Sequence, residues 1–200
     1  MSPIRVDKGA KRAEIVAAAL SVFRRKSLNS ITVSDIAAEA GIAKGAVYLY
    51  FDSKDDVYMS LLDFTFSELF EEYAQHPEID DPVEQLEHVF IEGLGEYEEH
   101  ELEFRFFVAY LGMSLGTPRG EAIVAKLRDS FRRNRATIEA IYRRGVREGR
   151  FRKMNPKRIS ASLMALSEFI PMQWVMDPQA FPLKPTGKTA FEIFKQGIIA

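Results

Sequence analysis

The sequence contains no cysteine, which excludes disulfides and thiolate metal sites and suits a reducing compartment. It has no apolar run of the roughly 20 residues that a membrane-spanning helix needs, and its N-terminus lacks a signal-peptide core. Three histidines, His76, His88 and His100, are too regularly spread along the chain to form a typical metal site. A phosphate-cradling glycine loop and a serine-elbow motif are also missing. We therefore expect a soluble cytoplasmic protein that is not an enzyme and holds no metal or cofactor.

The composition is that of a protein with a full hydrophobic core. The chain has 200 residues, of which 46% are hydrophobic, enough for one large domain or a small domain docked on a larger one. Proline and glycine cluster in four segments, which predict loops at 75–82, 116–120, 153–156 and 177–187. Between these segments apolar residues recur at helical spacing, and no strand-like alternation is followed by a hairpin turn. The sequence therefore predicts an all-α fold.

A net charge of −2 conceals three blocks of alternating sign. Residues 1–54 carry nine Lys or Arg and five Asp or Glu, and residues 68–103 carry fourteen acidic residues and no Lys or Arg. Residues 126–158 carry thirteen basic and three acidic residues. This basic block has three interpretations: a solvated face, a surface that meets the acidic block within or between subunits, or a site where arginines hold a phosphate or carboxylate of an effector.

Three helices are predicted near the N-terminus. An apolar stripe at helical spacing predicts the first, from about Lys8 to about Lys26. The second is short, about Val33 to Ala40. Thr32 is its expected N-cap, with an aspartate three residues later as in a capping box, and a glycine follows its last residue. The third is expected over about Lys44–Leu49, and a fourth helix begins soon after it.

Two short helices joined by a glycine turn and braced by a preceding helix indicate a helix-turn-helix, whose second helix presents its first residues to the major groove of DNA. The segment KGAVYLYF fits this use, because Gly45 lets the DNA backbone come close and Lys44 can reach a phosphate or a guanine edge. Tyr48 and Tyr50 can each donate a hydroxyl hydrogen bond to a phosphate while the ring packs on the domain. Tyrosines near a turn are more often packing residues. The combination with the capped helix, the glycine turn and the positive charge favours DNA.

The stretch ITVSDIAAEAGIAKGAVYLYFDSKDDVYMSLL, residues 31–62, resembles the DNA-binding segment of TetR-family transcriptional repressors. The family pattern is Thr, Ile-Ala, an Ala-Gly-Val/Ile turn, Ser-Lys-Gly, Tyr-x-Tyr/His-Phe and Ser-Lys-Glu. One departure is Ala43, where the family usually has a serine that caps the helix and binds phosphate. By this resemblance Ala46 and Leu49 stand at positions that help to choose the operator, and the DNA contacts are Thr32, Lys44, Gly45, Tyr48, Tyr50 and Lys54.

The resemblance also implies a helix-turn-helix DNA-binding domain over residues 1–54 and a helical effector-binding and dimerisation domain over residues 55–200. Several apolar side chains of the later helices are candidates for lining an effector pocket, although each is more often simply part of a core. The effector would be a small apolar molecule, and acyl-CoA thioesters, to which some family members respond, are one such class. The candidate ligand-binding residues are Phe90, Phe107, Tyr110, Leu111, Phe169 and Trp174.

Two C-terminal helices, about 156–176 and about 187–199, carry apolar stripes at spacings of three and four. Such a pair can pack against the same pair of a second chain in a four-helix bundle about a two-fold axis, and the family resemblance implies the same homodimer. The competing interpretation is that the stripes face the chain's own core. The predicted interface residues are Leu163, Leu166, Ile170, Phe191, Phe194 and Ile198.

The sequence thus predicts a ligand-responsive repressor that binds a palindromic double-stranded operator as a homodimer. A small-molecule effector is expected to release it from the DNA, and no membrane partner is expected. The alternative is a helical ligand-binding or scaffold protein whose helix-turn-helix no longer recognises an operator. The presence of Lys44, Gly45, Tyr48 and Lys54 favours the first, and a salt-dependent shift with operator DNA would separate the two.

Overall fold

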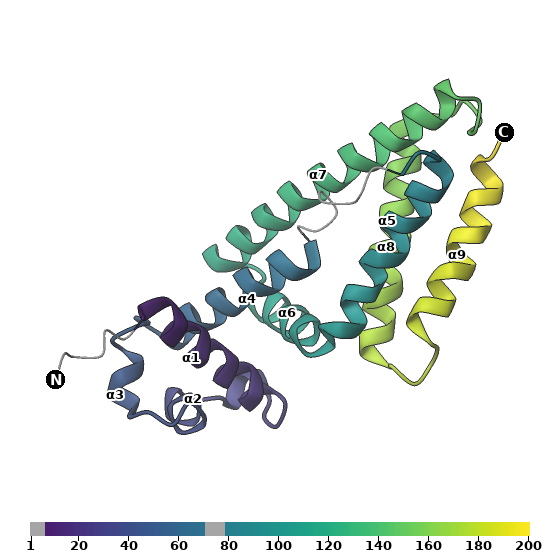
Figure 1. The fold of residues 1–200 in the computed structure, drawn as a ribbon. Coiled ribbons are helices and arrows are strands. Elements are labelled where there is room, and N and C mark those ends of the chain that lie inside the picture. The colour runs from purple at the N-terminus through teal and green to yellow at the C-terminus, as the bar shows by residue number, and fades with distance from the viewer. Residues whose placement is uncertain (1–6, 71–78) are drawn as a thin grey trace. The chain divides into compact units, whose positions relative to one another are not determined.

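The computed structural model describes residues 7–70 and 79–200, with side chains for all of them except 67–70. Within these ranges every regular element is an α-helix, apart from the 3-10 turn η1 (Leu28–Ser30) and one isolated bridge between Phe151 and Ile199 (Figure 1). The predicted all-α fold is therefore confirmed. The helices are α1 (Lys8–Phe23), α2 (Val33–Glu39), α3 (Lys44–Val47), α4 (Lys54–Phe70), α5 (Pro82–Glu99), α6 (Glu101–Ser114), α7 (Pro118–Arg147), α8 (Pro156–Met176) and α9 (Leu183–Ile198).

The helices form two compact units. The N-terminal unit consists of Met1–Phe66 and Leu102–Met113, and so contains α1 to α3 and most of α4 and α6. The C-terminal unit consists of Ser67–Glu101 and Ser114–Ala200. Compactness therefore divides the chain within α4, whereas the sequence predicts a functional boundary after residue 54, which stays a prediction. In the described part of the chain no helix is both long and apolar enough to cross a membrane.

The helices of the N-terminal unit begin where the sequence predicts but end earlier. α1 stops at Phe23 and α2 at Glu39. The predicted third helix is a single turn, because the N–H of Leu49 bonds to the carbonyl of Ala46 three residues back, at 3.2 Å, in a tightened turn rather than a continued α-helix. The predicted loop at 75–82 lies partly outside the described residues.

Two of the predicted loops, 116–120 and 177–187, extend by more than one residue into helices. α7 begins at Pro118, where Thr117 caps the helix by accepting a 3.2 Å hydrogen bond from the N–H of Gly120. α9 begins at Leu183 rather than Gly187 and includes Pro185 in its first turn. Both corrections have one cause: the first N–H groups of a helix have no partner within it, so a proline there removes nothing.

Aromatic rings form the centre of the N-terminal unit. The ring of Phe106 on α6 lies 5.6 Å from that of Phe23, 5.4 Å from that of Tyr58 and 5.7 Å from that of Tyr110, between ring centroids. The hydroxyl of Tyr58 donates a 3.3 Å hydrogen bond to the carbonyl of Leu28. This cluster joins α6 and α4 to α1 and to the turn that precedes α2.

Helix α5 is central to the C-terminal unit because it packs against α7, α8 and α9. The rings of Phe90 on α5 and Phe191 on α9 lie 5.5 Å apart between centroids. At the end of α7, Tyr142 stacks on Phe151 at 5.4 Å and donates a 2.6 Å hydrogen bond to the carbonyl of Arg152. These contacts fix the connection between α7 and α8.

The basic block meets the acidic block within one chain at a few places. Arg150 forms a 2.6 Å ion pair with Asp81, which also caps α5. Arg144 donates hydrogen bonds of 2.7 Å to the carbonyl of Ile79 and to the side-chain oxygen of Gln85. One of the three interpretations of the basic block, contact with the acidic block within a subunit, therefore holds for part of it.

A carboxyl group, that of Glu168 on α8, lies half-buried in the C-terminal unit. Burial raises the pKa of Glu168 from 4.5 to about 7, and a hydrogen bond from Tyr97 on α5 acts in the opposite direction. The proton is therefore held more tightly in the folded protein than in an unfolded chain.

We expect Glu168→Gln to change how stability depends on pH. Because the folded pKa lies above the value of about 4.3 for an unfolded chain, the free energy of unfolding falls as pH rises from about 4 to about 7. The variant should lose the part of that fall that Glu168 contributes, so its stability relative to the parent should rise between about pH 4 and about pH 7 in urea titrations. Glu99→Gln, at an exposed site on α5, is the control and should show no such rise. A pH-independent difference for Glu168→Gln would contradict the raised pKa.

Candidate nucleic-acid interface

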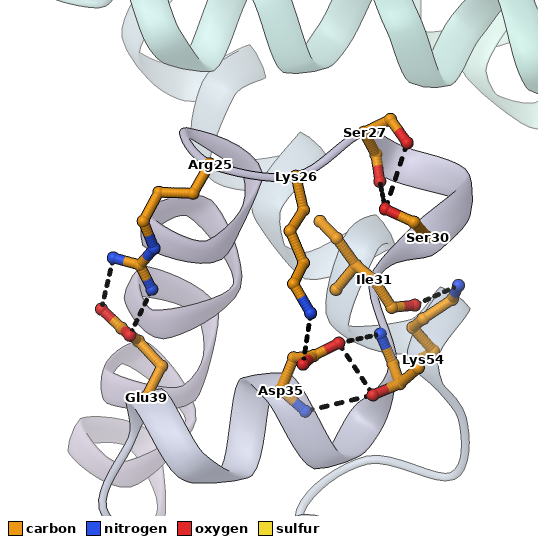
Figure 2. Close-up of polar contacts among 9 residues, drawn as sticks. Arg25, Lys26, Ser27, Ser30, Ile31, Asp35, Glu39 and Lys54 are labelled. Atoms are coloured by element: carbon orange, nitrogen blue, oxygen red, sulfur yellow. Dashed lines mark hydrogen bonds and ion pairs between the residues drawn. The ribbon is translucent and has the colours of Figure 1, made fainter.

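The first turn of α2 is held by a capping box. The hydroxyl of Thr32 accepts a 3.2 Å hydrogen bond from the N–H of Asp35, whose carboxylate accepts a 2.9 Å bond from the N–H of Thr32. Lys26, just after α1, donates a 2.7 Å hydrogen bond to the same carboxylate (Figure 2). The Lys26 bond, followed by the bonds from Thr32, lowers the pKa of Asp35 from 3.8 to about 2. Asp35 therefore stays ionised at neutral pH and ties α2 to the end of α1.

The last residue of α2 is held in the same way. Glu39 accepts a 2.5 Å hydrogen bond from Arg25 and a 2.6 Å bond from Ser21, and the Arg25 bond is the main reason why the pKa of Glu39 is lowered. Figure 2 shows the Arg25 pair and the Asp35 network on the same helix. Exposed ion pairs of this kind add little stability, so their contribution is to the orientation of α2. The burial of Ile36 and Ala37 supplies the packing.

Helix α3 presents its first residues to solvent. Lys44 and Gly45 are exposed, and Lys44 makes no ion pair with any residue in the described ranges. Val47, 1% exposed, anchors the helix in the core of the unit. Ala43 stands at the N-cap without a side-chain hydrogen bond, so the first N–H groups of α3 have no capping side chain.

Among the described residues, no contact requires a glycine at position 45. A Cβ atom built there would meet nothing within 4 Å, and its φ is not positive. Gly41 differs, because its φ of 64° lies in the left-handed region that ends α2. The space in front of Gly45 is therefore open to a partner that must approach the backbone closely.

The remaining predicted DNA-contact residues lie on the turn that follows α3. Tyr48 is 49% exposed, and Leu49 is 75% exposed. Tyr50 and Ala46 are half-buried. The structure thus brings Lys44 to Tyr50 together on one short, largely exposed segment, and their individual roles stay predictions.

Lys54 has a structural contact that the sequence did not predict. Its ammonium group donates a 2.8 Å hydrogen bond to the carbonyl of Ile31, directly before the N-cap of α2 (Figure 2). The same group lies 5.5 Å from the centroid of the Tyr58 ring. An ammonium group has three donors, so this bond leaves capacity for a phosphate. Lys54 therefore joins the start of α4 to the start of α2 and can still serve the predicted role.

Arg12 on α1 was missed by the sequence analysis altogether. Its guanidinium donates hydrogen bonds to the carbonyl of Tyr50 and, at 3.1 Å, to the hydroxyl of Ser60, and lies 4.1 Å from the centroid of the Phe51 ring. Arg12 thus fastens the turn after α3 to α1 and α4. No local pattern predicts it, because Tyr50 lies 38 residues further along the chain.

The predicted effector-binding residues lie in both units. In the C-terminal unit Phe90 and Trp174 are buried, whereas Phe169 is 63% exposed. An open cleft of about 650 Å³ between α7 and α8 has walls that include four basic side chains, Arg132, Arg135, Arg143 and Lys157. The other three predicted residues belong to the N-terminal unit. Phe107 and Tyr110 are core residues there, and Leu111 is half-buried.

The predicted dimer residues mostly face their own chain. On the same two helices, three other large apolar side chains are exposed by more than 60%: Phe169, Met176 and Ile193. The competing interpretation, that the predicted stripes face the chain's own core, therefore describes four residues, and dimerisation itself stays a prediction. Leu166 and Phe194 are half-buried, and the four buried residues are Leu163, Ile170, Phe191 and Ile198.

Among the described residues, one group has the composition of a metal site. The ligand atoms of Glu96, Glu99 and His100 lie within 4.8 Å of one another at the end of α5. His100 is the C-cap of α5, and its ring lies 3.8 Å from the Glu96 carboxylate one turn earlier. Helix geometry alone brings such i, i+4 side chains together, and Glu99 is exposed.

Comparisons with known proteins agree with the helix-turn-helix. Residues 15–61 match the model for bacterial regulatory proteins of the tetR family. The HTH-type transcriptional repressor KstR2 of Mycobacterium tuberculosis is 27% identical over 71% of this chain and 70% of its own length. A further curated regulator, YfiR of Bacillus subtilis, matches at 37% identity, and the chain spans only 32% of its length. These relatives are regulators of transcription rather than enzymes.

Solved structures share the fold. A TetR transcription regulator from Haloarcula marismortui superposes with a TM-score of 0.78 at 20% identity, over 96% of this chain and 100% of that one. The structure of SmeT in complex with triclosan gives a TM-score of 0.74 at 24% identity, over 96% of this chain and 92% of that one.

We expect Gly45→Ala to weaken DNA binding without harming the fold. The new methyl group has no described atom within 4 Å, so the free energy of unfolding should stay within about 1 kcal/mol of the parent value. It would, however, stand between α3 and a DNA backbone. Gly112→Ala is the matched control, because Gly112 lies in α6 and its added methyl group also meets nothing within 4 Å. Fluorescence anisotropy with labelled duplex should show a loss of affinity for Gly45→Ala alone. Equal affinities for both variants would remove Gly45 from the interface.

Proposed function

Because this chain belongs to the TetR family of transcriptional regulators, we propose that it represses transcription in the cytoplasm by binding a palindromic operator as a homodimer and that a small-molecule effector releases it. The observation that carries the proposal is the exposed start of α3, where Lys44 is unpaired in the described structure and Gly45 is open to a close partner. An internal structural role would require neither feature. A DNA duplex uses both, since it offers phosphates and acceptor-rich base edges at short range.

The segment from Lys44 to Tyr50 is suited to the major groove by its small size and by the contacts that hold it in place. α3 is a single turn, so on its own it would not be a stable helix, and Val47, Arg12 and Lys54 hold it and its neighbouring segments in place. In our proposal Lys44 meets a phosphate or a guanine edge, and the hydroxyls of Tyr48 and Tyr50 meet phosphates. Ala46 and Leu49, with no polar side-chain atoms, contribute apolar contacts such as those with thymine methyl groups.

A homodimer supplies the two-fold symmetry that a palindrome needs. The exposed apolar side chains of the last two helices, Phe169 and Met176 on α8 and Ile193 on α9, are the surface that we propose for the interface. The interface is then rotated on each helix relative to the stripe predicted from the sequence, with the half-buried Leu166 and Phe194 at its border. Burial of these side chains against a second chain would remove apolar surface from water, which favours association.

The effector in this proposal is a small apolar molecule bound in the helices beyond the helix-turn-helix. Phe90 and Trp174 offer apolar contacts there, and Tyr97 and Glu168 offer a polar pair. The basic cleft between α7 and α8 would suit an anionic head group, as on an acyl-CoA thioester. The binding of triclosan by SmeT, a protein of similar fold, supports a ligand of this size. Release requires that the effector bind the DNA-free state more tightly than the DNA-bound state.

The DNA part of the proposal predicts the effect of Lys44→Ala. Duplexes selected from a random pool should contain a palindrome, and the variant should bind the selected site more weakly by about 1–3 kcal/mol if the lysine meets a base edge. Lys188→Ala, which removes the same charge from an exposed position on α9, should bind like the parent. Anisotropy titrations at several salt concentrations provide both numbers. Unchanged binding by Lys44→Ala, or the absence of any selected site, would refute operator recognition through α3.

The dimer part of the proposal predicts that Phe169→Arg separates the subunits. An arginine at this exposed position would place a charge in an apolar interface but would leave the core of the protomer intact. The parent should sediment as a dimer and the variant as a monomer, with weaker binding to the palindrome. Ile170→Ala is the control on the neighbouring buried face, and it should lower the unfolding free energy while the protein remains dimeric. A dimeric Phe169→Arg protein would rule out this face of α8.

A further inference from the structure

A groove of about 500 Å³ lies within the N-terminal unit, between α1 and α4. Its walls are mainly apolar, with Val16 and Leu20 from α1 and Leu61 and Phe64 from α4. Phe64, one of the lining residues, is 45% exposed. Small-molecule sites in proteins are typically apolar hollows of about 300–1,000 Å³ with a few polar groups, and the groove falls within that description.

The polar side chains that line the groove are those of Arg12, Ser60 and Glu103. Arg12 lines it on α1, two turns before Leu20. Glu103 lines it on α6, one turn before Phe106, whose ring packs on Phe23 beyond Leu20. A molecule in the groove would meet a cation at one end and apolar walls along most of its length.

The charge of Arg12 is not neutralised by any described residue. Both of its hydrogen-bond acceptors are neutral, the carbonyl of Tyr50 and the hydroxyl of Ser60, and it forms no ion pair. Glu103, by contrast, has an interaction partner of its own. A guanidinium binds a carboxylate in a two-pronged, charge-assisted arrangement that is stronger than its bonds to neutral oxygens. The groove thus has an unfilled preference for an anion at the Arg12 end.

We propose that this groove is a second ligand site, which takes a medium-chain carboxylate with its tail between α1 and α4 and its head group on Arg12. The regulatory half of this proposal rests on the proposed function. A carboxylate on Arg12 competes with the Tyr50 carbonyl, so the ligand loosens the turn that follows α3. Ligand binding in the groove therefore opposes DNA binding directly, without a signal from the C-terminal unit.

The direct test of the site uses the full chain and decanoate as the probe, without DNA. Methyl NMR signals of Val16, Leu20 and Leu61 should shift as decanoate is added. Ala17→Trp, a change at an exposed residue of the groove wall, should fill the groove and abolish these shifts while the remaining spectrum shows an intact fold. Shifts that persist in Ala17→Trp, or that occur only among C-terminal signals, overturn the site.

The chemistry of the head group is tested separately. Arg12→Gln should weaken decanoate at least tenfold in isothermal titration, because a charge-assisted pair is lost. Decanol, with the same tail and no charge, should bind the parent and Arg12→Gln alike. If Arg12→Gln weakens decanol as much as decanoate, the loss is structural and the carboxylate preference is wrong. If decanol binds the parent as tightly as decanoate does, the carboxylate gains nothing from Arg12, and the proposed head-group contact is wrong.

The regulatory consequence is measured on a selected operator duplex. Decanoate should lower the affinity of the parent for DNA about tenfold at saturation and leave that of Ala17→Trp unchanged. Groove binding with no change in DNA affinity overturns the regulatory half and leaves the site. A parent protein that binds no duplex at all, but still shifts the groove methyl signals, refutes the proposed function and not the ligand site.

Discussion

The position of α2 is the constraint on which the DNA-facing surface depends. Buried Ile36 and Ala37 supply the packing energy of this short helix, but apolar contacts alone allow it to slide or rotate on α1. Ion pairs and capping bonds at its two ends, through Asp35 and Glu39, remove that freedom. α3 is too short to place itself, so it inherits its orientation from α2 and from the two cationic side chains, of Arg12 and Lys54, that bind backbone carbonyls nearby.

The features that the sequence predicted well are local ones. The Thr32 capping box and the cap of α4, where Ser53 accepts a 3.1 Å bond from the N–H of Asp56, lie within three residues of chain and follow from residue type and spacing. The contacts of Arg12 and Lys54 were missed because they join segments 38 and 23 residues apart. Any exposed arginine or lysine is compatible with such a contact, so composition and spacing carry no signal for it.

Which face of a helix packs in its own core and which is free for a partner chain could not be predicted from the sequence, for a different physical reason. α8 carries apolar side chains on opposite sides, with Leu163 and Ile170 buried in the chain and Phe169 exposed. A spacing of three or four identifies a stripe, and two stripes on one helix give no order of preference between core and interface. Only the packing of α5, α7 and α9 around α8 shows which stripe is already used. The polar pair of Tyr97 and Glu168 was unpredictable because its members lie on two helices, α5 and α8, that are far apart in the sequence.

A one-turn α3 has a consequence for how such a protein can diversify. Under the proposed operator recognition, so few side chains of α3 reach outward that each half-site would be contacted at only a few base pairs, each worth about 1–3 kcal/mol against a mismatch. Leu49, 75% exposed, takes almost no part in the core. If Leu49 contacts DNA as we propose, replacements there would alter the sequence preference at little cost in folding free energy. Gene duplication followed by one such change would therefore yield a regulator with a new set of targets and an unaltered scaffold.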